Sequence, residues 1–195
     1  MNNIILQGII KNIQPSHITN DIEYYKANLI VKREDGKEDI INLKFKRFSN
    51  PYKENDEISL IGNVRTYTQK CEDHNSVEVY VFTYMDKPEE DFKNLVLLDG
   101  RICKKGELRK TRAGKDVLDF ILANNIVSGN QSMNCYIPLV AWGKLAKEIN
   151  KLDIGSIINI QGQLHSREYK KKISEDDFEI RVAHEIDINK LLESE

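Results

Sequence analysis

The sequence lacks most of the features that mark secreted, membrane-spanning or metal-bound proteins. Its three cysteines, Cys71, Cys103 and Cys135, are odd in number and widely spaced without a CxxC pair, so neither a disulfide framework nor a zinc site is expected. No run of about 18 apolar residues occurs, which argues against a membrane-spanning helix. No charged leader with an apolar stretch follows Met1, and we therefore expect a cytoplasmic protein with reduced thiols.

An excess of charge of one sign is also missing. The 29 Lys and Arg residues nearly balance the 31 Asp and Glu residues, and the pI is close to 6.1. This balance excludes a uniformly basic coat for nucleic acid, so any such surface must be local. The four histidines are scattered, and no P-loop, GxSxG or HxxxH pattern occurs. We expect a protein without enzyme activity, metal or cofactor.

An internal repeat is the most informative feature that is present. One apolar run ends at Gly8 and a similar run ends at Gly100, which lies 92 residues later. A second pair of similar segments surrounds Gly62 and Gly162, 100 residues apart. The two halves therefore run in step, with small insertions, as two copies of one unit.

A charged stretch separates the two copies. Residues 86–91 contain Pro and acidic residues without an apolar anchor, which is typical of a linker. We predict a first domain at residues 1–86 and a second at residues 92–190. The charge is divided unevenly, because residues 1–90 carry a net charge of -3 and residues 91–195 a net charge of +1.

The local patterns within each half predict an all-β fold. Short apolar or alternating segments, bounded by Gly, Asn, Ser and Lys, predict strands over residues 119–124, 136–142, 157–164 and 178–186. Residues 143–150 have helical spacing and predict a short helix, whereas Pro51 disfavours a helix at the corresponding place in the first half. Each half fits a five-stranded Greek-key barrel of the oligonucleotide-binding (OB) type, and in the second the helix lies between strands 3 and 4.

Alternation along the strands separates an interior from an outward face. The odd-numbered residues 135–141 form a small apolar set suited to a barrel interior, which turns Tyr136 and Trp142 outward. On the long strand that follows the helix, Arg167 and Tyr169 fall on the outward side. One interpretation is that the two outward rings of the earlier strand only cover the barrel ends or pack against the helix.

The placement of charge favours a binding surface instead. Residues 101–115 hold seven basic side chains and one acid, and they border the strands that carry the rings. Unpaired bases stack on aromatic rings with about 1 to 3 kcal/mol each, and Lys and Arg neutralise the phosphates. This pattern predicts binding of single strands with little sequence specificity. The candidate nucleic-acid-binding residues are Tyr136, Trp142, Tyr169, Arg101, Arg109, Lys110, Arg112, Arg167, Lys170 and Lys171.

Several blocks of the second half occur in the order of a known family. They are residues 94–101, 106–109, 120–123, 137–146 and 155–164. In these blocks the chain resembles the bacterial single-stranded DNA-binding protein family. The resemblance implies an OB barrel without catalytic activity and an assembly of four barrels, hence a homodimer of this chain. It also implies stacking aromatics at Tyr136, Trp142 and Tyr169, and a backbone-contacting cation at Arg109.

The sequence departs from the family pattern in three places. Residues 126–134 contain no aromatic where the family usually carries one. Residues 189–195 end the sequence without the acidic, apolar-tipped tail that recruits replication and repair proteins, so we expect no recruitment by that route. The first half is a diverged copy whose third predicted strand carries no ring on its outward face. Its weaker candidates are Lys44, Lys46, Arg65 and Tyr67.

A competing hypothesis is an interaction module. OB barrels also join subunits, and an acidic first half would suit a partner protein in a replication or primosome complex, with only weak nucleic-acid binding. Under the binding hypothesis the ligand is single-stranded DNA, although stacking rings also accept RNA. The expected setting is the nucleoid in the cytoplasm, in replication, recombination or maintenance of a mobile element, with no membrane partner.

Overall fold

A computed structural model describes most of the chain as β-strands. The described ranges are residues 1–47, 52–70, 75–86, 93–128, 131–172 and 177–193. The first half contains β1 (Asn2–Thr19), β2 (Ile22–Lys32), β3 (Glu38–Lys46), β4 (Glu57–Lys70) and β5 (Asn75–Asp86). The second half contains β6 (Asn94–Lys105), β7 (Arg109–Lys110), β8 (Asp116–Ser128), β9 (Gln131–Trp142), α1 (Gly143–Asn150), β10 (Ile157–Lys172) and β11 (Phe178–Leu192).

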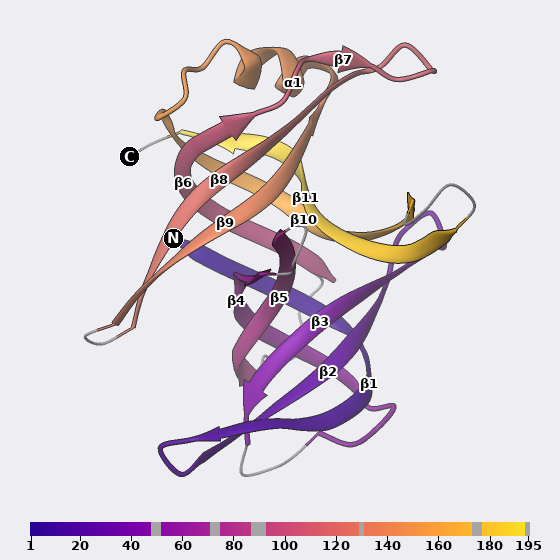
Figure 1. Cartoon of the computed structure of the whole chain (residues 1–195), viewed down its shortest axis with the longest axis vertical. Coiled ribbons are helices and arrows are strands. Elements are labelled where there is room, and N and C mark those ends of the chain that lie inside the picture. Colours follow the sequence, from indigo (N-terminus) through magenta and orange to yellow (C-terminus); the bar gives the residue numbers. More distant parts are fainter. Residues whose placement is uncertain (48–51, 71–74, 87–92, 129–130, 173–176, 194–195) are drawn as a thin grey trace.

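The strand pairings close each half into its own barrel. In the first half β1 pairs with β2 and β4, while β3 pairs with β2 and, in parallel, with β5, which returns to β4. In the second half β6, β8, β9, β11 and β10 repeat the same order, again with one parallel pair. The prediction of two tandem OB barrels is confirmed. Figure 1 shows them stacked along the long axis, with α1 at the far end of the second barrel.

Alternation along the strands fills the barrel interiors. The predicted interior residues Cys135, Ile137, Leu139 and Ala141 are at most 1% exposed. The predicted helix is α1, which spans eight residues and buries Ala146 and Ile149. No helix in the described ranges is long and apolar enough to cross a membrane.

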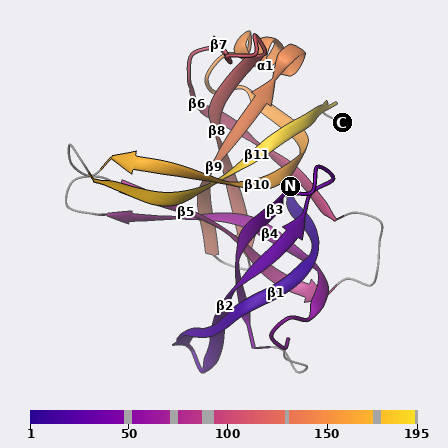
Figure 2. The same cartoon turned by 90° about the vertical axis from the view of Figure 1, so that its right-hand side faces the viewer.

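The strands extend further than their apolar patterns predict. β10 and β11 stay paired from Gly162 opposite Ile188 to Lys172 opposite Phe178, well past the end of the barrel. Figure 2 shows this hairpin projecting to one side, with β5 extending beneath it. The residues of β10 beyond the predicted end at residue 164 are mostly polar and leave no apolar signal, which is why the sequence pattern of this strand ends too early. The predicted strand over residues 178–186 already includes the β11 arm of the hairpin. Most of the predicted linker and Pro51 fall on residues 87–92 and 48–51, outside the described ranges.

An approximate two-fold axis relates the two barrels. β1 pairs antiparallel with β6 and joins both barrels into one sheet of 11 strands. In this pairing Ile4 lies opposite Val96, and these residues are 92 positions apart, like Gly8 and Gly100. Equivalent residues therefore face each other across the junction, as they would between two copies of one chain.

A buried carboxylate fixes the junction between the barrels. Asp39 on β3 is fully buried and accepts hydrogen bonds from Arg33 Nε at 2.8 Å, His165 Nδ1 at 2.8 Å and the Ser166 amide at 2.6 Å. Burial alone would raise the pKa of Asp39. The bonds from His165, Arg33 and Ser166 outweigh burial and hold this pKa well below its usual range. The ionised carboxylate thus connects β3 of the first barrel to β10 of the second.

Replacing this carboxylate should weaken the whole chain. We expect Asp39→Asn to lower the free energy of unfolding by about 3 kcal/mol, because it leaves buried donors without a charged acceptor. For a chain of this size that corresponds to a fall in Tm of about 6 to 12 °C. Because the folded pKa lies below the unfolded one, the stabilisation is present above pH ~4 and is lost as the pH falls. The Tm difference between the wild type and Asp39→Asn should therefore shrink in acid.

The matched control lies on the same hairpin. Asp35 is half-exposed and its described ion pair is with Lys37, at 3.2 Å. Asp35→Asn should lower the Tm by less than half as much as Asp39→Asn does, since a solvent-exposed ion pair contributes little to stability. Equal melting temperatures for the two variants at neutral pH would contradict the assigned role of Asp39.

Candidate nucleic-acid interface

An aromatic ring, Trp142, and a cation, Arg109, lie on the outward face of the second barrel at the end next to α1. Arg109 on β7 lies opposite Val117 on β8, which in turn lies opposite Trp142 on β9. Residues opposed in antiparallel strands share one face of the sheet, so the guanidinium and the indole are on the same side. The guanidinium of Arg109 is exposed and lies 2.7 Å from the Asp119 carboxylate.

The Trp142 ring is held in a defined position. Lys115 Nζ lies 5.2 Å from the ring centroid, within the range of a cation–π contact. The Trp142 side chain also lies close enough to Asp187 on β11 to influence the pKa of that carboxyl. Burial raises the pKa of Asp187, and His165 and the Trp142 side chain only partly oppose this effect.

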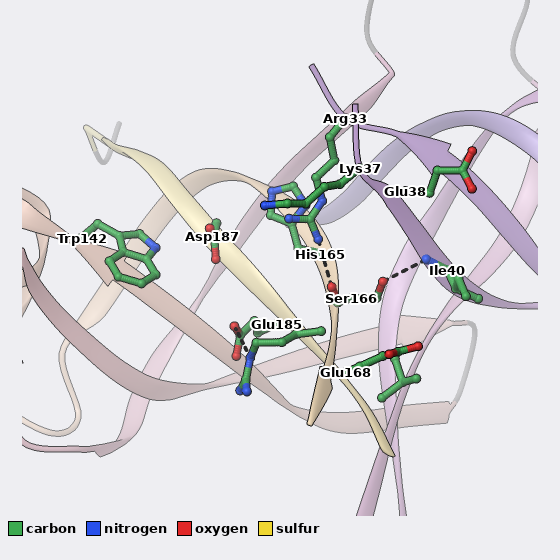
Figure 3. Close-up of a pocket in the computed structure, with 12 residues that line it drawn as sticks. Arg33, Lys37, Glu38, Ile40, Trp142, His165, Ser166, Glu168, Glu185 and Asp187 are labelled. Atoms are coloured by element: carbon green, nitrogen blue, oxygen red, sulfur yellow. Dashed lines mark hydrogen bonds and ion pairs between the residues drawn. The ribbon is translucent and has the colours of Figure 1, made fainter. Parts of the chain in front are cut away.

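Trp142 lines a pocket of about 420 Å³ that both halves of the chain build. The second barrel contributes the ring and, from β10, Arg167; the first contributes Arg33 and Lys37 from the hairpin between β2 and β3. Figure 3 shows Trp142, Arg33 and Lys37 around the pocket. We call it the Trp142 pocket. Its wall also carries four carboxylates, those of Glu38, Glu168, Glu185 and Asp187.

The pocket continues along β10 toward the projecting hairpin. Arg167 Nε lies 3.5 Å from Glu185, and the same guanidinium lies 6.0 Å from the Tyr169 ring centroid. Tyr169 is 37% exposed, and Lys170 beside it is exposed. The structure thus places Trp142, Arg167 and Tyr169 in one row of ring, cation and ring, on the outward side that the strand pattern predicts.

Tyr136 is not part of this row. It is 52% exposed and does not line the Trp142 pocket. Its amide instead donates to Thr66 Oγ1 on β4 of the first barrel, at 3.0 Å. Parity along β9 correctly turns both Tyr136 and Trp142 outward, but the first barrel lies against the part of the strand that carries Tyr136.

The other predicted cations have different surroundings. Arg101 donates to the Gly155 carbonyl, and Lys110 Nζ lies 2.9 Å from Asp116. Arg112 is exposed in the turn between β7 and β8. None of these three, nor Lys170 and Lys171, lines the Trp142 pocket.

The first barrel carries rings that the sequence interpretation missed. Lys44 Nζ lies 4.0 Å from the ring centroid of Tyr80 and 5.9 Å from that of Tyr67, and it pairs with Glu78 at 3.1 Å. Arg65 lies 4.1 Å from the ring centroid of Phe82. Tyr67 on β4 is among the candidates predicted from the sequence, whereas Tyr80 and Phe82 on β5 are not.

A signal for these rings was present in the sequence. Val79 and Val81 are core residues of β5, so alternation turns Tyr80 and Phe82 outward.

In the part of the chain that the structure describes, no group of three or more His, Cys, Asp or Glu side chains is arranged to hold a metal ion.

Comparison with known families identifies the class of protein. Residues 93–191 match the model of the single-strand binding protein family. The chain belongs to this family, which agrees with the prediction that it is not an enzyme.

Individual relatives have matching names. The "Single-stranded DNA-binding protein 1" of Staphylococcus aureus (strain MSSA476) is 34% identical over 83 residues, covering 40% of this chain and 53% of that protein. The "Single-stranded DNA-binding protein A" of Bacillus subtilis (strain 168) is 37% identical over 83 residues, covering 40% of this chain and 48% of that protein. The chain thus spans about half the length of the curated relatives it matches.

One solved structure shares the whole arrangement. The wild-type single-stranded DNA binding protein from Thermus aquaticus has a TM-score of 0.73 and 18% sequence identity, covering 100% of this chain and 93% of that one. At this identity the likeness concerns the fold, and it extends to both barrels, including the first half that the family model does not reach.

The contact between Asp187 and the indole predicts a pH-dependent fluorescence. Trp142 is the only tryptophan, so the emission reports the surroundings of this one ring. Because burial raises the pKa of Asp187, the emission should change with a midpoint above pH ~4, the value for an exposed aspartate. The transition should disappear in Asp187→Asn and persist in Glu185→Gln, which alters another carboxylate of the pocket wall. A midpoint below pH ~4, or an unchanged transition in Asp187→Asn, would contradict this assignment.

Proposed function

We propose that the chain binds single-stranded DNA with little sequence specificity. The observation that carries the proposal is the continuous surface from the half-buried Trp142 ring, across Arg167, to the Tyr169 ring. Rings stack on unpaired bases of any sequence, and the cation between them suits the connecting phosphate. Family membership and the names of the relatives support the same ligand.

The charges of the Trp142 pocket suggest how a strand lies on it. Its wall carries four carboxylates against the three cations Arg33, Lys37 and Arg167, so the pocket suits a neutral base better than a phosphate. The phosphates would then follow the rim, where Arg109 and Lys115 stand on one side and Arg167 on the other. Tyr136 and the cations Arg101, Lys110, Arg112, Lys170 and Lys171 would extend this rim.

The proposal includes the setting in which the chain acts. Residues 1–86 and 92–190 would be its two binding or assembly units, located at the nucleoid in the cytoplasm. A protein that covers unpaired strands would serve replication or recombination, where such strands arise.

A fluorescence titration tests the ligand and its place together. Oligo(dT) should quench the emission of Trp142 strongly, because a stacked base lies against the only indole. The logarithm of the binding constant should fall with the logarithm of salt by about 0.7 for each phosphate contacted. Arg167→Gln should weaken binding and reduce this slope by about 0.7. Parallel titration with oligo(rU) measures the preference for DNA over RNA.

A matched control is available in the same half. Lys151 is exposed in the turn after α1 and lines none of the described pockets, so Lys151→Gln should bind like the wild type, with the same salt slope. Binding of oligo(dT) with no change in Trp142 emission would reject the proposed site. A complete lack of salt dependence would reject the contact with phosphates.

We further propose that two chains assemble into a homodimer with four barrels. The resemblance to a family of four-barrel assemblies supports this state. On the projecting hairpin, the alternate residues Phe178, Ile180 and Val182 of β11 are all exposed large apolar side chains. Such a row is costly to leave in water and suits the contact with a second copy.

Light scattering under DNA-binding conditions tests this assembly. The wild type should have twice the 22.6 kDa mass of one chain, and Ile180→Glu should reduce the mass to that of one chain. Ile154→Glu is the matched control, because Ile154 is 64% exposed and Ile180 is 65% exposed. A monomeric wild type would overturn the homodimer, and a dimeric Ile180→Glu would overturn this interface.

A further inference from the structure

The approximate two-fold axis makes the contacts between the halves reciprocal. The Ile40 amide on β3 donates to Ser166 Oγ on β10 at 2.9 Å, and the Tyr136 amide on β9 donates to Thr66 Oγ1 on β4 at 3.0 Å. Ser166 and Thr66 are 100 positions apart, like Gly162 and Gly62. The hairpin between strands two and three of each barrel therefore docks on the outward face of the other barrel in the same way.

The registers of the parallel pairs confirm which positions correspond. Leu43 lies opposite Val81 in the first barrel, as Leu139 lies opposite Ile186 in the second. By this register Lys46 corresponds to Trp142, and Phe82 corresponds to Asp187.

Two glycines repeat the same correspondence. A Cβ on Gly62 would lie 2.6 Å from the Phe82 carbonyl oxygen, and a Cβ on Gly162 would lie 2.4 Å from the Asp187 carbonyl oxygen. Only glycine permits this close approach between the strands. The backbone around Gly162 and Asp187, beneath the Trp142 pocket, thus has its counterpart around Gly62 and Phe82 in the first barrel.

A pocket occupies that counterpart position. It measures about 450 Å³ and is lined by Tyr24, Lys46, Arg65 and Phe82 of the first barrel. The hairpin between β8 and β9 of the second barrel closes it with Ile126, Ser132 and Met133. We call it the Phe82 pocket. The hairpin that has lost the usual aromatic of the family thus contributes an apolar wall here.

The two pockets differ in their charge. The wall of the Phe82 pocket carries two rings and two cations and no carboxylate, whereas the wall of the Trp142 pocket combines three Lys and Arg side chains with four carboxylates. The Tyr24 and Phe82 ring centroids are 6.4 Å apart, and Arg65 lies over the Phe82 ring at 4.1 Å. His17 stacks on Tyr24 at 4.6 Å and holds this ring in place.

We propose that the Phe82 pocket holds a second unpaired nucleobase of the strand that stacks on Trp142. The base lies between the rings of Tyr24 and Phe82 on one side and the apolar side chain of Met133 on the other, and Lys46 and Arg65 meet its phosphate. The inference rests on the proposed function and assigns binding of single-stranded DNA to the first barrel as well as to the second. Since this pocket lacks carboxylates, it attracts a polyanion at least as well as the Trp142 pocket does.

Photo-cross-linking of the wild-type chain tests this placement directly. An oligo(dT) carrying 5-iododeoxyuridine at single positions should form adducts on peptides that contain Tyr24, Phe82 or Met133, and also on the peptide that contains Trp142. Adducts at Trp142 alone would overturn the inference and leave the proposed function intact. The experiment needs no variant and therefore does not depend on the folding of one.

A variant measures the contribution of the first barrel. Phe82→Leu should weaken binding of long oligo(dT) about tenfold and shorten the occluded length, because one stacked base is lost. Quenching of Trp142 at saturation should remain, because the strand still meets the second barrel. Tyr84 lies two residues further along β5, is exposed and does not line the pocket, so Tyr84→Leu should bind like the wild type.

The outcomes separate the two proposals. Wild-type affinity and occluded length in Phe82→Leu, with Trp142 quenching retained, would overturn the inference only. A wild-type chain that neither binds oligo(dT) nor responds in its fluorescence would overturn the proposed function itself.

Discussion

The antiparallel pairing of β1 with β6 is the contact on which the other features of this chain depend. It places Ile4 opposite its counterpart Val96, so the two barrels face each other across an approximate two-fold axis. That geometry brings the hairpin of each barrel onto the outward face of the other, and the fully buried Asp39 fixes one of these contacts with hydrogen bonds from His165 and Ser166. Neither candidate pocket would exist on an isolated barrel, because each needs a wall from the other half.

Equivalent backbone positions in the two barrels carry different chemistry. Phe82 and Asp187 occupy the same place opposite a strand glycine, and Lys46 and Trp142 occupy the same place at the end of the third strand of each barrel. Joining two copies in one chain removes the requirement that both faces share one sequence. The Trp142 pocket therefore combines the indole with three cations and four carboxylates, while the Phe82 pocket has a pair of rings and two cations without a carboxylate.

Local patterns in the sequence predicted the features that are set within a single strand or helix. Period-two alternation gave the interior residues around Ile137, and helical spacing gave α1 with its observed bounds. Contacts between strands far apart in the sequence left no such pattern. Alternation turns Tyr136 outward, but it carries no information about the first barrel lying against it. The grouping of Phe82 with Arg65 depends on the register between β4 and β5, which the sequence alone does not fix.

The inequality of the two pockets has a consequence for directionality. A nucleic-acid strand is polar, with distinct 5′ and 3′ ends, whereas a symmetric pair of identical barrels offers the same contacts to a strand running either way. In this chain an indole beside acids stands at one end and a guanidinium over a phenyl ring at the other. If a strand occupies both pockets as proposed, its two orientations are unequal in energy, so the covalent fusion would favour one strand polarity.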